Sequence, residues 1–256
     1  MNTLKKLKNV KDQMTALSMA LLVILFSTTA YSNAPQFAEG EVLSVMAPSG
    51  LTLRVAPDKN SENLIIIPYA DQVLVLPQLE NTNVETIDWV TGQWIFVDYE
   101  GIEGYIFDGY LSNLNVPSFD FERCHLDMDF VYPLEAWSDI NLGRFSNDTT
   151  NAGAMNRVTS IYDSGDKRIS TIKGNEHKLE LYLQDVRLMD AYHLLITMLD
   201  NDTTVDLFTE NSKFFKDKEG DLYKVKIDVD NPVTIRQMKD NRIKISVWSY
   251  DYHCAE

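Results

Sequence analysis

The chain has 256 residues and a net charge of −15, from 23 Lys and Arg against 38 Asp and Glu. Hydrophobic residues make up 45% and charged residues 24%, which excludes a disordered or collagen-like chain and suffices for one or two folded domains. The acidity argues against a nucleic-acid binder, because neutralising phosphates requires clustered Lys and Arg. Two cysteines are too few for a disulfide-rich scaffold or a four-Cys zinc site.

The N-terminus has the pattern of a secretory signal peptide. Lysines dominate the first 11 residues, residues 14–30 are uncharged, and small side chains follow at Ala30 and Ser32. This order predicts a signal peptide over residues 1–32 that is cleaved after Ser32, and therefore a periplasmic or secreted protein without an integral membrane segment. The alternative is an uncleaved anchor, although 17 uncharged residues lie at the lower limit for spanning a bilayer.

Cleavage would make the chain more acidic. It removes four Lys and one Asp and leaves 19 basic and 37 acidic side chains, a net charge of −18. Such a charge is expected to repel anionic lipids and other polyanions and to attract cationic groups. Solubility alone would account for the same acidity.

Residues 37–114 contain short β-type segments between turn residues. Alternating or β-branched stretches, separated by Gly, Pro, Asn and Asp, occur at residues 41–46, 50–55, 64–68, 72–76, 94–99 and 104–107. Short strands at this spacing predict a small barrel or sandwich. Residues 77–93 interrupt the rhythm and are expected to form a long loop.

Four motifs in this region occur in the order found in bacterial SH3 domains. Residues 49–57 read SGLTLRVAP, residues 67–76 read IPYADQVLVL, residues 94–106 read WIFVDYEGIEGYI, and residues 109–111 read GYL. Together they resemble the bacterial SH3 (SH3b-type) family over about residues 40–114, although Ala70 stands where the family usually has Gly. The resemblance implies an SH3-like small β-barrel that binds cell-wall peptides.

Aromatic side chains are the candidate ligand-binding groups of this region. Tyr69, Trp89 and Tyr110 lie at turns or in the long loop, so we expect them to be exposed and to contact a ligand. Trp94 and Tyr105 begin strands and are expected to be structural. Nearby acids that could receive peptide amines are Asp71, Asp88 and Asp108.

Residues 115–256 show a different pattern and no family resemblance. Alternating segments precede and follow residues 186–199, where apolar side chains recur every three or four positions. This pattern predicts an α+β domain with an antiparallel sheet and one main helix, which Asp185 could cap. Residues 141–156 are rich in Asn, Gly, Ser and Thr and are expected to form a loop.

Cys124 and Cys254 both belong to this second region. An exported protein meets an oxidising compartment, so we expect the two cysteines to form a disulfide. The alternative is a catalytic thiol at Cys124 beside His125, because bacterial SH3 domains often precede cell-wall cysteine peptidases. Residues 122–126 read ERCHL, however, and lack the Ser and Gly that follow the nucleophile in those enzymes.

The sequence predicts no metal site and no cofactor. The four His residues lack metal-ligand spacing. Residues 200–206 begin like a calcium loop but have Val205 where the turn needs Gly, and Asn211 where the last ligand would be Glu. No phosphate-binding loop, nucleophile elbow or zinc-binding helix motif is present.

We therefore expect an exported, non-enzymatic cell-envelope protein whose SH3-like module binds a peptide, a peptidoglycan fragment or another envelope protein. Two alternatives remain. The chain could be a cell-envelope hydrolase with its active site in the C-terminal region, because two catalytic carboxylates have no fixed sequence spacing. It could also be a structural or protein-interaction protein.

Overall fold

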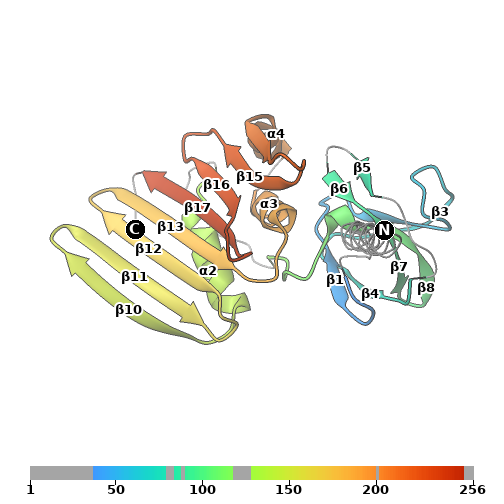
Figure 1. Ribbon diagram of the computed structural model, residues 1–256, viewed down its shortest axis with the longest axis horizontal. Helices are drawn as coiled ribbons and strands as arrows, with labels where there is room; N and C mark the ends of the chain where they lie inside the picture. The colour runs from blue at the N-terminus through green and yellow to red at the C-terminus, as the bar shows by residue number, and fades with distance from the viewer. Residues whose placement is uncertain (1–36, 79–83, 88–89, 118–127, 200–201, 251–256) are drawn as a thin grey trace, which may run out of the picture. The chain divides into compact units, whose positions relative to one another are not determined.

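The computed structural model describes residues 37–78, 84–87, 90–117, 128–199 and 202–250 (Figure 1). In these residues the protein is mainly β, with antiparallel sheets, as the sequence predicts. Residues 35–256 form one compact unit. No helix of the described residues is long and apolar enough to cross a membrane. The predicted signal peptide, Trp89, Cys124 and Cys254 lie outside the described residues.

A seven-stranded sheet is built from residues 42–112. Its strand order is β3-β2-β8-β7-β4-β1-β9, and every neighbouring pair is antiparallel. The strands are β1 (Val42–Val45), β2 (Leu51–Arg54), β3 (Asn63–Ile67), β4 (Gln72–Val75), β7 (Trp94–Tyr99), β8 (Ile102–Phe107) and β9 (Leu111–Ser112). A 3-10 turn, η1 (Asp108–Tyr110), precedes β9.

This first sheet is open, whereas the sequence predicts a barrel. Its end strands, β3 and β9, do not pair with each other in the described residues. The last strand has only two residues and pairs with β1 alone, and β2 meets β8 through the single pair Arg54↔Tyr105. Such short ladders do not close the sheet on itself. The side chains of alternate positions, such as Leu43, Val73 and Val97, still enclose an apolar core.

Two turns of this sheet place L-amino acids in the left-handed region. Glu100 (φ 51°) and Gly101 (φ 85°) form the two-residue connection between β7 and β8, where both central residues need positive φ. Ala70 has φ 68°, and its N–H donates to Val45 O at 3.0 Å. The position where the sequence departs from the SH3 pattern is therefore one that favours glycine.

A hairpin replaces part of the loop expected at residues 77–93. Strand β5 (Glu85–Ile87) pairs with β6 (Val90–Gly92), and Val90 is fully buried. Trp94 packs beside it and donates from Nε1 to a carboxylate oxygen of Glu85 at 3.1 Å. Each of these strands has three residues, which are too few for an alternating pattern to be recognised in the sequence.

An eight-stranded antiparallel sheet is built from residues 145–250 (Figure 1). Its order is β10-β11-β12-β13-β17-β16-β15-β14. The strands are β10 (Phe145–Ala152), β11 (Met155–Tyr162), β12 (Lys167–Lys173), β13 (Glu176–Leu183), β14 (Ser212–Lys216), β15 (Leu222–Ile227), β16 (Val233–Gln237) and β17 (Ile243–Tyr250).

Helices cover one face of this second sheet. They are α2 (Val131–Asn141), α3 (Leu188–Ile196) and α4 (Asp202–Glu210). Along β13 the odd-numbered side chains are buried and the even-numbered ones only half-buried or exposed, so Leu179, Leu181 and Leu183 face the helices. Met46 and Leu114, from the region of the first sheet, pack in the same core.

The prediction of one main helix is therefore wrong, because the described residues contain three α-helices. Helix α2 is short and carries Pro133 in its first turn, and its five buried residues make too short a run for a helical period to be recognised in the sequence. Helix α3 begins after Arg187, not at Asp185, because the backbone N–H of Arg187 donates to the Asp190 carboxylate at 3.0 Å.

Residues 141–156 are also not a loop. Strand β10 and the start of β11 form a long polar hairpin at one edge of the sheet, and every residue of β10 is exposed. Because neither face of β10 is buried, its sequence needs no apolar alternation. A strand of this kind has the composition of a loop.

Candidate functional site

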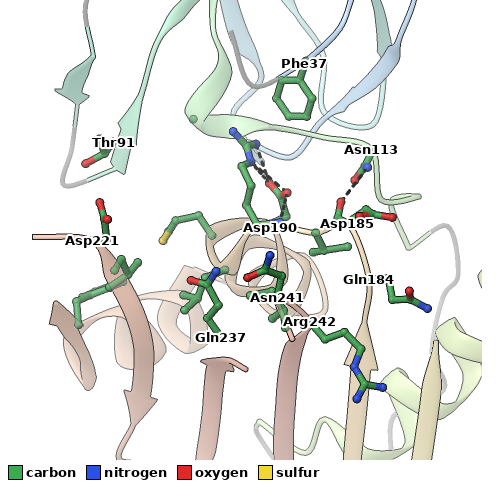
Figure 2. A pocket seen from close by; sticks show the side chains of 18 of the residues that line it. Phe37, Thr91, Asn113, Gln184, Asp185, Asp190, Asp221, Gln237, Asn241 and Arg242 are labelled. Carbon is green, nitrogen blue, oxygen red and sulfur yellow. Dashed lines mark hydrogen bonds and ion pairs between the residues drawn. The ribbon is translucent and has the colours of Figure 1, made fainter. Parts of the chain in front are cut away.

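A cleft of about 1110 Å³ lies among loops and strand ends of residues 37–243 (Figure 2). The first-sheet region contributes Phe37, Thr91 and Asn113. The second region contributes the segment 184–190, which leads into α3, and the connections β14–β15 and β16–β17. Figure 2 shows Phe37 and Thr91 on one side of the cleft and Gln237 and Asn241 on the other.

The lining is rich in side chains that both donate and accept hydrogen bonds. The carboxamide groups belong to Asn113, Gln184, Gln237 and Asn241. Carboxylates are contributed by Glu41, Asp185, Asp190, Asp221 and Asp240, and apolar surface by Phe37, Met189 and Phe214 among others. A carboxamide offers a carbonyl acceptor and two N–H donors, the same groups as a peptide bond. The cleft can therefore pair with the amides of a ligand and also contact its apolar groups.

Local structure holds several of these side chains in place. Asn113 donates from Nδ2 to Asp185 O at 3.3 Å. Asn241 has φ 63°, a conformation that Asn tolerates better than most residues, in the turn between β16 and β17. Gln184 donates from its backbone N–H to the Asp166 carboxylate at 2.7 Å and from Nε2 to Ser164 O at 3.3 Å. The wall of the cleft is therefore formed by turns and strand ends that hydrogen bonds hold in place.

Arg187 anchors one wall of the cleft. Its guanidinium donates to both carboxylate oxygens of Asp190, to Asp108 O at 3.1 Å and to Leu111 O. It also lies 4.6 Å from the centroid of the Phe37 ring. The side chains of Arg187, Asp108 and Asp190 are 15%, 3% and 2% exposed. These contacts join the start of α3 to the turn η1.

Burial shifts the pKa of Asp108. Burial raises the pKa of its carboxyl group, while Arg187 and the N–H of Gln93, which donates at 2.7 Å, act in the opposite direction. Gly92 allows this approach, because a Cβ atom there would lie 2.4 Å from the carboxylate of Asp108. The arrangement is structural, since the two carboxylate oxygens hold η1 against Gln93, just before β7, and against Arg187 at the start of α3.

His193 lies deeper along α3. Its ring stacks on Tyr110, with centroids 5.1 Å apart and an interplanar angle of 21°. The side chain is buried, and neither ring nitrogen has a hydrogen-bond partner in the described residues. Burial, together with the charge of Arg187, lowers the pKa of His193 to about 3. The imidazole is therefore neutral at physiological pH and acts as an apolar packing group.

Two of the predicted ligand-binding aromatics contact α3 or its C-terminal end. Tyr110 stacks on His193, and Tyr69 forms a hydrogen bond with the side chain of Thr197. Burial raises the pKa of Tyr69, and that hydrogen bond opposes the rise. Neither residue lines the cleft. Ligand contact at Tyr69 and Tyr110 stays a prediction, whereas Trp89 lies outside the described residues.

A serine and a histidine approach each other under α2. Ser170 Oγ and His177 Nε2 are 2.6 Å apart, and Glu135 Oε1 lies 3.8 Å from the same nitrogen. A hydrolytic triad instead places the acid on the other ring nitrogen, where it orients the base. Burial lowers the pKa of His177, while Glu135 and Asp129 oppose the change. This geometry describes a buried polar network, not an activated nucleophile.

The described residues bring together no group of three or more His, Cys, Asp or Glu side chains able to hold a metal ion. Residues 202–206, the described part of the calcium-loop-like segment, begin helix α4. A carbonyl-lined loop is therefore not formed there.

Comparison with protein-family models, with curated proteins and with solved structures gives no match for this chain.

Sequence reasoning missed the cleft because its residues come from distant segments. Gln237 and Asn241 are 124 or more positions from Asn113 in the sequence. Each stands in an ordinary turn or at a strand end, where polar residues are expected. Packing of the η1 region against the start of α3, together with strand pairing within the second sheet, brings these residues to one place, so no local pattern could have identified them.

Proposed function

We propose that the protein is an exported, non-enzymatic component of the cell envelope that binds an extended peptide, such as a cell-wall stem or cross-bridge, in the carboxamide-lined cleft. The observation that carries the proposal is the lining itself, which combines amide, carboxylate and apolar side chains in one cavity of about 1110 Å³. Ligand pockets of proteins commonly have volumes of about 300–1,000 Å³, so this one has room for several residues of a peptide.

The charges of the cleft favour a ligand with amino groups. Once Arg187 and Asp190 are set aside as a pair, the lining has four carboxylates, of Glu41, Asp185, Asp221 and Asp240, and two cationic side chains, Lys216 and Arg242. Arg242 is itself paired with Asp240. A peptide that carries free amines, as cell-wall stems and cross-bridges do, would meet acceptors here.

The resemblance to bacterial SH3 domains supports the same proposal. The four sequence motifs fall on β2, on the β3–β4 connection, on the β7–β8 hairpin and on η1 with β9. The first and last strands of the region pair with each other. We propose that this segment is an SH3-like module whose sheet is left open, and that its β5–β6 hairpin forms one side of the binding cleft.

The proposal is tested by titrating the mature chain with a purified muropeptide by calorimetry. We expect binding that Gln237→Ala weakens about fivefold, as expected for one lost hydrogen bond. The matched control is Gln72→Ala, an exposed residue of β4 that does not line the cleft. The absence of binding at millimolar ligand, or an equal effect of both variants, would overturn the assignment of this site.

The same samples separate the alternatives. Release of smaller muropeptide fragments by the purified protein would favour a hydrolase. Binding to another envelope protein without any binding of muropeptide would favour an interaction protein.

A further inference from the structure

The face of the eight-stranded sheet opposite the helices carries a concentration of basic side chains. Residues paired directly across antiparallel strands share a face, and alternate residues along a strand share it too. We start from Tyr182, whose side chain is half-buried. The side chains that share its face of the sheet form one set, which we call the basic face. Its cations are Arg157, Lys167, Lys173, Lys178, Lys213, Lys224, Lys226, Arg236 and Lys244.

Few acidic groups share this face. The register places Asp148, Glu176 and Glu180 on it, and Asp228 joins it through ion pairs with Lys213 and Lys226. Nine basic side chains therefore face four acidic ones in a chain whose net charge is −15. The excess of acidic side chains lies elsewhere on the molecule.

One row of the face contains no carboxylate. The pairs Lys167↔Tyr182, Tyr182↔Lys244, Lys244↔Arg236, Arg236↔Lys224 and Lys224↔Phe215 run across six strands, from β12 to β14. Neighbouring strands are about 4.8 Å apart, so the four cations extend over roughly 19 Å. We call this line of residues the basic row.

Three cations of the basic row have no acidic partner. Lys167, Arg236 and Lys224 form no ion pair with any carboxylate of the residues that the structure describes. The fourth, Lys244, pairs with Glu180, and Lys178 donates to the same carboxylate at 2.9 Å. Although burial alone would raise it, the pKa of Glu180 is lowered by these two lysines. Three charges of the row therefore remain for a ligand.

The rings on this face are covered by cations. Lys167 Nζ lies 4.4 Å from the centroid of Tyr182, Lys224 Nζ 5.0 Å from that of Phe215, and Lys178 Nζ 4.9 Å from that of Trp248. Nucleic-acid bases need free ring faces on which to stack, which these contacts obstruct. Charge arranged in a line, rather than exposed rings, thus defines what the face can recognise.

We propose that the basic row binds a linear anionic polysaccharide, whose carboxylate or phosphate groups run across the strands. The net charge of the chain predicts repulsion of polyanions, but exposed charges act only over a Debye length of about 8–10 Å at physiological salt. A polymer on this face therefore interacts mainly with the charges of the face itself, where nine basic side chains exceed four acidic ones. The site is separate from the peptide cleft and does not rest on its proposed function.

Binding of the mature chain to polygalacturonate and to phosphorylated dextran, measured by fluorescence anisotropy, tests the proposal and separates carboxylate from phosphate recognition. We expect saturable binding that weakens with added salt. The triple variant Lys167→Gln, Lys224→Gln, Arg236→Gln should lose about tenfold in affinity, the joint effect of three exposed ion pairs. The matched control is Lys59→Gln, Lys218→Gln, Lys239→Gln, which makes the same change of charge on exposed loops and should bind normally.

Several outcomes would overturn the proposal. They are absence of binding to both polymers, an equal loss in both triple variants, binding of neutral dextran as tight as that of the charged polymers, and tighter binding of single-stranded DNA or of anionic vesicles. Unchanged muropeptide binding by the first triple variant would show that the basic row and the cleft act independently.

Discussion

The two sheets of this protein are assembled from similar short antiparallel strands but differ in what packs on their faces and in the charge of their exposed side chains. The first sheet packs around its own apolar core, and residues 37–117 carry 12 acidic and two basic side chains. The second sheet buries one face under helices and leaves the other polar and basic. The strand pattern therefore does not decide the surface chemistry, which depends on what packs against each face.

The largest effect is expected where the second sheet meets its helices. Trp137 of α2 is fully buried and donates from Nε1 to Asn115 O at 2.8 Å. Trp137→Ala should lower the free energy of unfolding by about 3–5 kcal/mol, because it leaves a large cavity and an unpaired acceptor. Urea denaturation followed by circular dichroism measures this. On the same helix, Ile140 is 65% exposed, and Ile140→Ala should change stability by less than about 0.5 kcal/mol.

The link between the two regions gives a second test. Arg187→Met leaves Asp108 and Asp190 buried without their cation and should lower stability by about 3–5 kcal/mol at neutral pH. Burial raises the pKa of Asp108, and removal of Arg187 raises it further. A raised carboxyl pKa makes its stability contribution greatest at low pH and lost as pH rises through the folded-state value. The deficit of the variant should therefore shrink on acidification, and a constant deficit would contradict this account.

The contribution of His193 to stability is expected to depend on pH, because its imidazole is buried in the folded state and exposed in the unfolded state. Its folded-state pKa of about 3 lies below the unfolded value, so its contribution is complete above pH 6.5 and is lost as pH falls. The loss is about 1.4 kcal/mol per pH unit between these limits. His193→Phe keeps the stacking on Tyr110 and removes the titration. Unfolding measured from pH 7 to pH 5 should show a shallower decline for the variant, and parallel declines would refute a neutral buried imidazole.

The smallest effect concerns a turn of the first sheet. Ala70 has φ 68°, which costs an L-residue about 1–2 kcal/mol. Ala70→Gly removes that strain but raises the conformational entropy of the unfolded chain, which lowers stability by about 0.4–1 kcal/mol. The free energy of unfolding should therefore rise by about 0.5–1 kcal/mol. Thermal unfolding measures the difference. Ala56→Gly, at a residue without positive φ, should instead destabilise the protein.

The sequence predicted the strands whose alternation or β-branching is clear and missed those without a buried face. The predicted segments at residues 94–99 and 72–76 match β7 and β4 within one residue, because each has one buried face. Strand β10 has no buried residue, and its composition predicts a loop. Helix α4 and strand β14 are short and mostly polar or exposed, so they too carry little periodic signal.

The candidate sites were less accessible to sequence reasoning than the strands. Their positions in turns predict that Tyr69 and Tyr110 are exposed, but each contacts a residue on or beside α3. Such contacts join segments more than 80 residues apart, and no local pattern encodes them. The cleft arises in the same way, from segments of the two sheet regions that become neighbours only through tertiary packing.

The sequence alone determined the antiparallel, mainly β character of the chain and its total charge, because side-chain alternation and ionisable groups are properties of the residues themselves. Only the tertiary structure determined where the charged side chains lie on the surface. Lys167, Lys224 and Arg236 are separated in sequence by up to 69 positions and fall in one row only because β12, β13, β17, β16 and β15 are neighbours in that order. Net charge is a sum, whereas recognition depends on distances, and distances between remote residues are set by the fold.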